Sequence, residues 1–260
     1  MNELITVIMP TYNRSFSFIN KSILSVCHQT YRNIELIIID DNSKENQDKF
    51  GISNHIRNNE WPINIIYIAH EANLGACKAR NTGIIHSKSE YIGFLDDDDE
   101  FIIDKIEKQY NVIKNSNYGL VYCLSNNITL EKNTQDKSAS VRKGINNNRK
   151  FKHLLMDNYI GSTSVVLTKK SVLDDVGYFN EMLLSAQDVE LWIRIARKYK
   201  VYGINEYLVN YYIHNNERIS TNYTKKCQGL NMLNEIIFSN YKIPNKVKAV
   251  RLTKTLLVLV

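Results

Sequence analysis

The chain has 260 residues, of which 43% are hydrophobic and 23% are charged, and its formal net charge is +6. This is the composition of an ordinary globular protein, and the length allows one large domain or one domain with a helical appendix. No apolar run reaches the ~18 residues of a membrane-spanning helix, so none is predicted. The mild excess of positive charge suits anionic partners such as nucleotides or a lipid surface.

The four cysteines, Cys27, Cys77, Cys123 and Cys227, are far apart in the sequence. No pair has the spacing of a zinc knuckle or a redox motif, and scattered thiols fit a reducing compartment. The first four residues lead directly into a predicted strand and lack the shape of a signal peptide. We therefore expect a cytoplasmic protein.

The first 95 residues alternate apolar runs with helical patterns. Residues 4–9 form a nearly continuous apolar run, as a strand covered on both faces requires, and the run ends at Pro10. Further strands are predicted at 34–39, 63–69 and 91–95, with helices at 17–29, from 44 to about 58, and at 75–86. Repeated β-α-β units predict a mostly parallel, doubly wound α/β sheet with helices on both faces.

The pattern changes after residue 100. The predicted elements are a helix at 101–114, strands at 120–124, 128–130 and 164–167, a helix at 189–199 and extended chain at 201–212. Residues 131–150 are polar and rich in Asn, Lys and Ser, so we expect a long mobile loop of the kind that covers or selects a ligand. From residue 224 onward the chain is basic and predicted to be mostly helical.

Four consecutive aspartates, Asp96 to Asp99, follow the predicted strand at 91–95. Neighbouring carboxylates raise each other's pKa unless a cation relieves the repulsion, and hard oxygen ligands suit Mg²⁺, Mn²⁺ or Ca²⁺. Ligands of open α/β sheets bind beyond the carboxyl ends of the strands, which favours a metal-diphosphate site here. The alternative is a solvated acidic turn at the start of the next helix.

Polar groups follow three predicted strands, at residues 10–14, 40–43 and 96–99. Adjacent parallel strands would bring these groups to one edge of the sheet. Neither a P-loop nor a glycine-rich dinucleotide fingerprint is present. We therefore expect any nucleotide here to be held by side chains at strand ends and by a metal.

With these motifs in view, the chain closely resembles the family 2 glycosyltransferases of the GT-A fold. The matching segments, in the family's order and spacing, are VIMPTYNR (7–14), IDDNS (39–43), NLGACKARN (73–81), FLDDDD (94–99) and SAQDVELW (185–192). The resemblance covers residues 4 to about 220. It implies a GT-A domain over 1–220, with a nucleotide-binding part (1–100) and an acceptor-binding part (101–220), followed by a C-terminal helical extension (221–260). It also implies sugar transfer from a nucleotide-diphosphate donor with inversion at the anomeric carbon.

The resemblance assigns nucleotide contacts to seven residues: Pro10, Thr11, Tyr12, Arg14, Asp41, Arg80 and Asp97. Asp41 matches a carboxylate that reads the base, and a carboxylate accepts the N3–H of uracil or thymine, so a UDP- or dTDP-sugar donor is expected. The alternatives are a turn or helix cap for Asp41, a surface arginine for Arg80 and a packed strand-end aromatic for Tyr12.

Asp96 and Asp98 form the D-x-D pair of the family and are the expected ligands of Mn²⁺ or Mg²⁺. Alternation in an extended segment would place both on one side of the chain. The metal would act as a Lewis acid that neutralises the departing diphosphate. His214 matches a histidine that completes the metal shell in some relatives, and the sequence leaves open whether it binds metal or is structural.

Asp188 matches the general base of the family, which would take the proton of the acceptor hydroxyl. The alternative is structural, because Ser185 and Asp188 have the spacing of a capping box. The family usually has Glu-Asp at this point, whereas this chain has Gln187 and Asp188. That departure removes one negative charge and keeps the base.

The C-terminal segment 242–260 combines lysines and Arg251 with apolar residues. Such a helix can lie on an anionic membrane, and the alternative is packing against the catalytic domain. The sequence leaves open whether the natural chain continues past Val260.

Together these features predict a metal-dependent, inverting glycosyltransferase, cytoplasmic or peripheral on the inner face of the membrane. Its acceptor is expected to be a glycan or lipid-linked saccharide in surface polysaccharide synthesis, and no nucleic-acid partner is expected. One rival is a nucleotide-sugar-binding protein without catalysis, for which Gln187 is the hint. A second is a nucleotidyltransferase, which would need a glycine-rich basic loop after the first strand. The sugar, linkage and oligomeric state are not readable from the sequence.

Overall fold

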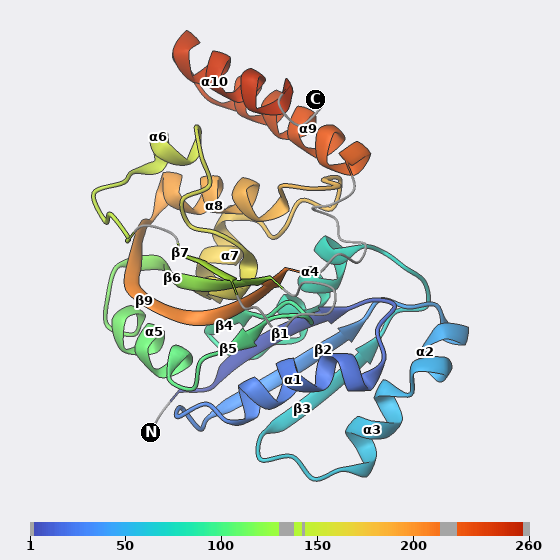
Figure 1. Cartoon of the computed structure of the whole chain (residues 1–260). Coiled ribbons are helices and arrows are strands. Elements are labelled where there is room, and N and C mark those ends of the chain that lie inside the picture. Colours follow the sequence, from blue (N-terminus) through green and yellow to red (C-terminus); the bar gives the residue numbers. More distant parts are fainter. Residues whose placement is uncertain (1–2, 130–137, 142–143, 214–222, 257–260) are drawn as a thin grey trace.

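A computed structural model of the chain describes residues 3–129, 138–141, 144–213 and 223–256 (Figure 1). The described strands form one mixed sheet in the order β3-β2-β1-β4-β8-β6-β9-β5, and β7 pairs with β6. The strand bounds are β1 Ile5–Thr11, β2 Ile34–Asp40, β3 Asn64–Ala69, β4 Tyr91–Phe94, β5 Glu100–Phe101, β6 Tyr118–Thr129, β7 Ser138–Val141, β8 Val166–Lys169 and β9 Lys200–Ile213.

The N-terminal half is the predicted parallel unit. Strand β1 pairs in parallel with β2 and β4, and β2 pairs in parallel with β3. Helix α1 (Phe16–Cys27) packs against this sheet through Ile19, Ile23 and Val26, whose i, i+4, i+7 spacing puts them on one face. The other helices here are α2 Lys44–Phe50, α3 Ile52–Asn58 and α4 Ala76–His86.

The C-terminal half extends the same sheet with antiparallel pairs. Strand β8 pairs antiparallel with both β4 and β6, and β6 pairs in parallel with β9. The helical elements of this half are α5 Lys105–Ile113, α6 Phe151–Leu154, the 3₁₀ helix η1 Thr163–Val165, α7 Lys170–Val176 and α8 Gln187–Lys198. Helices surround the sheet (Figure 1), and the predicted fold class is confirmed.

Four element predictions were wrong in detail. The helix expected from residue 101 begins at Lys105, because Glu100 and Phe101 pair with β9. The strands expected at 120–124 and 128–130 are one strand, β6, and the helix expected from 44 to 58 is split at Gly51, which has φ 63°. Residues 138–141, expected to be loop, form β7 on β6; residues 130–137 and 142–143 lie outside the described residues.

Two helices end the described chain, α9 (Tyr223–Asn240) and α10 (Asn245–Leu256). Leu233 and Ile237 of α9 belong to the main hydrophobic core. Arg251 of α10 is buried, where its Nε donates to Asn234 Oδ1 (2.7 Å) and its Nη1 donates to the Leu155 carbonyl (2.9 Å). The packing alternative for the basic tail therefore holds for α10. None of the described helices is long and apolar enough to cross a membrane.

Candidate active site

A cavity of about 670 Å³ opens where β1, β2 and β4 end. Residues from α4, from the turn before α8 and from α9 complete its wall. The predicted site residues that line it are Pro10, Thr11, Tyr12, Arg14, Asp41, Arg80, Asp96, Asp97, Asp98 and Asp188. His214 lies outside the described residues. The expected meeting of strand-end groups at one edge of the sheet is therefore found.

The acidic run after β4 is held by a different set of partners at each residue. Asp96 Oδ1 accepts hydrogen bonds from Arg80 Nη2 (2.6 Å) and Thr163 Oγ1 (3.0 Å). Asp97 Oδ2 accepts from Thr11 Oγ1 (2.8 Å). Asp99 is buried and accepts from the hydroxyl of Ser164 (2.6 Å). Asp96, Asp97 and Asp99 are thus engaged with the surrounding protein, which is not expected of a fully solvated turn.

Negative charge accumulates in this part of the cavity. Burial, and after it the neighbouring charge of Asp98, raise the pKa of Asp97 to about 7, while the hydrogen bond from Thr11 and the charge of Arg14 act in the opposite direction. Arg14 Nε lies 3.9 Å from Asp97 Oδ1. A cation bound beside these carboxylates would relieve the repulsion.

Asp96 and Asp98 line the same cavity and fit a divalent ion that takes further ligands from a bound diphosphate. Mg²⁺ commonly binds through one or two protein carboxylates together with substrate phosphates and water. Within the described ranges, no group of three or more His, Cys, Asp or Glu side chains is placed to hold an ion without such help. The donor set therefore suits a metal that arrives with its nucleotide.

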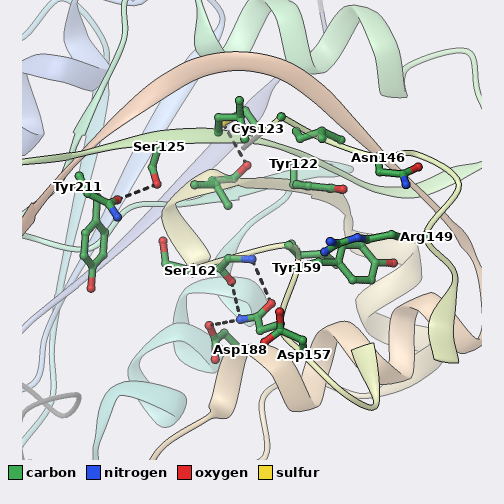
Figure 2. Close-up of a pocket in the computed structure, with 18 residues that line it drawn as sticks. Tyr122, Cys123, Ser125, Asn146, Arg149, Asp157, Tyr159, Ser162, Asp188 and Tyr211 are labelled. Carbon is green, nitrogen blue, oxygen red and sulfur yellow. Dashed lines mark hydrogen bonds between the residues drawn. The ribbon is translucent and has the colours of Figure 1, made fainter. Parts of the chain in front are cut away.

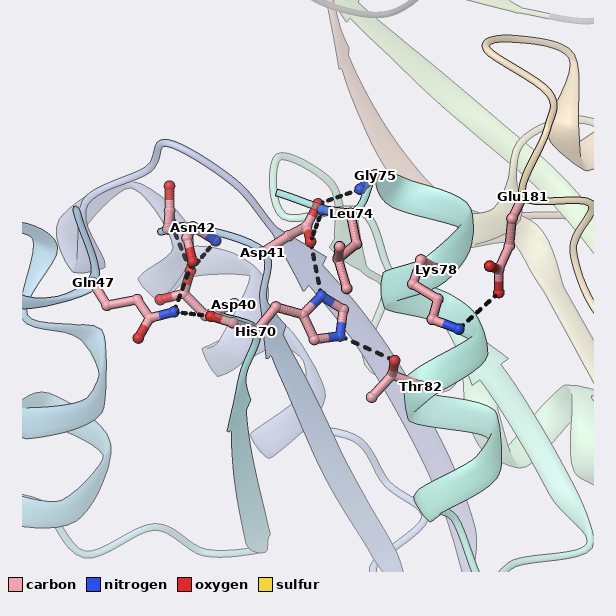
Figure 3. Close-up of polar contacts among 10 residues, drawn as sticks. All are labelled: Asp40, Asp41, Asn42, Gln47, His70, Leu74, Gly75, Lys78, Thr82 and Glu181. Carbon is pink, nitrogen blue, oxygen red and sulfur yellow. Dashed lines mark hydrogen bonds and ion pairs between the residues drawn. The ribbon is translucent and has the colours of Figure 1, made fainter. Parts of the chain in front are cut away.

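Asp41 joins the end of β2 to the loop before α4 (Figure 3). Its Oδ1 accepts the backbone N–H of Leu74 (2.9 Å) and contacts His70 Nδ1 (2.8 Å), and its Oδ2 accepts the N–H of Gly75 (2.8 Å). Asp41 thus forms neither a local turn nor a helix cap: its carboxylate holds the loop before α4, and no side chain caps α2 or α4. An ionised carboxylate has about four acceptor positions, so these three contacts leave room for one more donor.

Arg80 and Tyr12 differ from their structural alternatives. Arg80 is only 8% exposed and lies on α4 with its guanidinium 5.6 Å from the ring centre of Phe179. Its Nε is buried and has no hydrogen-bond partner among the described residues. Tyr12 is 50% exposed at the cavity, so it is not a packed aromatic.

Asp188 lies in the first turn of α8. The residue that precedes this helix is Ala186, in the left-handed region at φ 57°, and no side chain caps the helix. The predicted capping box is absent, because the Ser185 hydroxyl instead donates to the Lys226 carbonyl (3.2 Å). Burial raises the pKa of Asp188, while the backbone N–H of Val189 and the charge of Arg80 lower it.

A second cavity of about 520 Å³ adjoins the first (Figure 2). The two share four lining residues, Asn158, Ser162, Asp188 and Tyr211. Asn158 Nδ2 donates to Asp188 Oδ2 at 3.2 Å. Asp188 therefore stands where the two cavities meet.

The far part of the second cavity is aromatic and carries an arginine. Tyr122 and Tyr159 have ring centres 6.2 Å apart, and Arg149 lies 5.4 Å from the ring centre of Tyr159. The Tyr159 hydroxyl is buried and has no hydrogen-bond partner among the described residues. Sequence analysis missed these three residues, since no motif surrounds them and they come together from strand β6 and from the segments before and after α6.

Comparison with known proteins gives a consistent picture. The family model described as Glycosyl transferase family 2 matches residues 6–177. An uncharacterized glycosyltransferase of Methanocaldococcus jannaschii is 27% identical over 82% of this chain and 72% of its own. One of Rickettsia conorii is 33% identical over 78% of this chain, which spans only 32% of that relative.

A relative with a stated activity is the UDP-Glc:alpha-D-GlcNAc-diphosphoundecaprenol beta-1,3-glucosyltransferase WfgD of Escherichia coli. It is 30% identical over 78% of this chain and 73% of its own. Among solved structures, S. aureus TarS in complex with UDP-GlcNAc has a TM-score of 0.70 at 17% identity, over 97% of this chain and 71% of that one. The mannosyltransferase PcManGT of Pyrobaculum calidifontis, in complex with GDP-Man and Mn2+, has a TM-score of 0.69 at 17% identity, over 98% and 70%. These two likenesses concern the fold.

Proposed function

The chain belongs to glycosyl transferase family 2, and we propose that it transfers a sugar from a UDP- or dTDP-sugar to an acceptor hydroxyl with inversion. The observation that carries the proposal is the position of Asp188, which lines both adjoining cavities. One cavity has the groups that a nucleotide diphosphate requires, and the other is a partly aromatic space whose charged lining residues are Arg149, Asp157 and Asp188. A base at their junction can take the proton of a hydroxyl that enters from one cavity as the oxygen of that hydroxyl attacks a sugar carbon in the other.

The first cavity is the proposed donor site. Tyr12 is exposed for stacking on the base, and Asp41 has acceptor capacity for the N3–H of uracil or thymine. Arg14 and Arg80 bring positive charge to the diphosphate, with Asp97 between the strand end and Arg14. WfgD is named for a UDP-Glc donor, which supports a uridine nucleotide here.

Asp96 and Asp98 would hold Mn²⁺ or Mg²⁺ beside the diphosphate. The ion would supply Lewis-acid neutralisation of the leaving group. In the structure, Arg80 Nη2 donates to Asp96 Oδ1, which places the arginine beside the proposed metal ligands, where it would add positive charge for the diphosphate. His214 stays a proposed ligand from family resemblance alone.

Asp188 is the proposed general base. The acceptor oxygen forms the new bond to the anomeric carbon as the bond from that carbon to the phosphate oxygen breaks. The acceptor's proton passes to the Asp188 carboxylate, and the electron pair of the broken bond leaves with the diphosphate. The N-terminal end of α8 favours the ionised form that this role needs.

The second cavity is the proposed acceptor site. Its tyrosine rings and amide side chains suit a saccharide, and the unpartnered Tyr159 hydroxyl offers it a hydrogen bond. The acceptor that WfgD is named for is a lipid-linked saccharide, which supports a glycan or lipid-linked acceptor and a role in surface polysaccharide synthesis. Leu252 and Leu256 of α10 are 48% and 60% exposed, and they support peripheral contact with the inner membrane face.

The rival without catalysis is disfavoured by the side chain that suggested it. Gln187 donates from Nε2 to the Leu183 carbonyl (2.8 Å), so it serves the turn and leaves Asp188 in the cavity. The nucleotidyltransferase rival is set aside by family membership.

A thermal-shift screen tests the proposed donor. UDP or dTDP with Mn²⁺ is expected to raise Tm more than CDP or GDP, because a ligand that binds only the native state stabilises it. Asp41→Ala should compress this order; its shifts are read against its own ligand-free Tm, since Asp41 also holds the loop before α4. A greater shift with CDP or GDP for the unaltered protein would contradict the base assignment. No release of UDP or dTDP from any sugar nucleotide would favour the rival without catalysis.

A further inference from the structure

Helix α9 packs against the turn that carries Asp188, with almost no space between the two backbones. Gly229 of α9 is at the point of contact. A Cβ built on Gly229 would lie 2.2 Å from Ser185 Oγ, 2.6 Å from Ser185 N and 2.8 Å from Ser185 O. Two of these three atoms are backbone, so rotating a side chain would not relieve the overlap. Only glycine permits this approach.

The turn held by this contact has a conformation that needs support. Ala186 has φ 57°, and a non-glycine residue in the left-handed region costs on the order of 1–3 kcal/mol. Such a residue persists when its surroundings fix it. Here the surroundings are the close contact at Gly229 and the hydrogen bond from the Ser185 hydroxyl to the Lys226 carbonyl. Ser185 and Ala186 thus lie between α9 and the first turn of α8, which carries Asp188.

Helix α9 also forms part of the donor cavity. Lys225, Lys226 and Leu230 line it, within one turn of Gly229 on either side. The resemblance to the family, by contrast, ended near residue 220. A helix beyond that limit therefore contributes both to the wall of the cavity and to the support of Asp188.

Burial of α9 does not by itself require the glycine. Leu233 and Ile237 are 1% and 0% exposed and anchor the helix in the core one and two turns further on. Glycine inside a helix costs roughly 0.5–1 kcal/mol relative to alanine. A glycine at position 229, where α9 meets the turn before α8, therefore agrees with a need for the two backbones to approach closely there.

We propose that Gly229 is a positioning residue for transfer: by letting α9 contact the Ser185 backbone, it fixes the turn that sets Asp188 at the junction of the two cavities. This inference rests on the proposed function, in which Asp188 is the base. It predicts that a change at Gly229 impairs turnover more than nucleotide binding. The reason is that the turn carries the base, whereas most donor contacts come from β1, β2 and the acidic run.

The test uses the full chain with Gly229→Ala. Its kcat for UDP or dTDP release from a UDP- or dTDP-sugar that the unaltered protein turns over should fall at least tenfold, since small misplacements of a catalytic group can cost about 10²-fold. Its Kd for UDP with Mn²⁺, measured by calorimetry, should stay within about twofold. Gln228→Ala, an exposed neighbour on the same helix, is the matched control and should leave both quantities unchanged.

A second variant covers the case in which Gly229→Ala does not fold. Ser185→Ala removes only the hydrogen bond to Lys226 and is expected to lower kcat by roughly two- to tenfold at constant Kd for UDP. The proposal is overturned if Gly229→Ala keeps the kcat of the unaltered protein. It is also overturned if Gly229→Ala unfolds while Ser185→Ala turns over normally. An unaltered protein that releases no UDP or dTDP from any sugar nucleotide would overturn the proposed function and this inference with it.

Discussion

The aspartates that line the first cavity have different hydrogen-bond partners, both within the acidic run and at Asp188. Asp96 is paired with Arg80, Asp97 with Thr11, and Asp188 with the amide of Asn158. Only Asp188 of these three lines both cavities. Asp188 is therefore the one of these three carboxylates that is placed to take a proton in the proposed acceptor site. Asp96 and Asp97 line only the proposed donor site.

Replacing Asp188 by Asn tests its role as the base. The variant should fold, because no side chain caps α8 and Asn has the same size. Its kcat should fall by about 10²–10⁴, the usual contribution of general base catalysis, with an unchanged Kd for UDP. Asp175→Asn, an exposed aspartate on α7, is the matched control. Transfer at nearly the original rate by Asp188→Asn would refute the assignment.

The pH profile adds a second readout for Asp188. Burial raises its pKa, and the base acts in its ionised form, so activity should fall on acidification at a higher pH than for an exposed aspartate. This acidic limb should be missing from the residual activity of Asp188→Asn. A limb at the same pH in both proteins would assign it to another group.

At the scale of single elements, α5 contains a buried lysine. Lys105 is 0% exposed; its Nζ donates to Gln109 Oε1 (2.7 Å) and lies 3.9 Å from the ring centre of Phe101. Burial lowers the pKa of Lys105 from 10.5 to about 8, and Lys105 forms no ion pair with a carboxylate among the described residues. Helix α5 thus places a cation in the core without a carboxylate that would hold it charged.

This lysine predicts a specific pH dependence of stability. The folded pKa (about 8) is below the unfolded one (10.5), so between these values the unfolded chain binds more protons and stability rises with pH. The difference amounts to about 3 kcal/mol. Lys105→Met should raise Tm at pH 7 and remove this rise. Lys108→Met, on the same helix but paired with Asp104 and Glu206, should keep it. An unchanged rise in Lys105→Met would contradict the account.

Some helices and strands could be predicted from the sequence alone, and others could not. Apolar runs predicted β1, β2 and β4 because strands buried on both faces need them, and the aspartates that follow β2 and β4 were predicted to lie at the ends of these strands. Pairing between strands that are far apart in the sequence could not be predicted: Glu100 and Phe101 form a strand because β9 lies beside them. For the same reason the motifs predicted Asp96, Asp98 and Asp188, whereas Tyr159 and Gly229 came only from three-dimensional contact.

At the scale of the whole molecule, one sheet carries two adjoining cavities. The parallel half, with α4, supplies most of the proposed donor site, and β6 with the segment before β8 supplies the proposed acceptor site. Helix α9 adds Lys225, Lys226 and Leu230 to the lining of the proposed donor site. For the molecule as a whole, we predict that the first cavity binds a nucleotide diphosphate together with a divalent ion.

Calorimetric titration of UDP and dTDP, with Mn²⁺ and with chelator, tests this claim most directly. The account predicts tighter binding with Mn²⁺ by at least tenfold, because the ion would bridge Asp96 and Asp98 to the diphosphate. Asp98→Ala should bind with the same weak affinity in both conditions, while Asp175→Ala should behave as the unaltered protein. Equal affinities with and without Mn²⁺ for the unaltered protein, or no binding of either nucleotide, would contradict it.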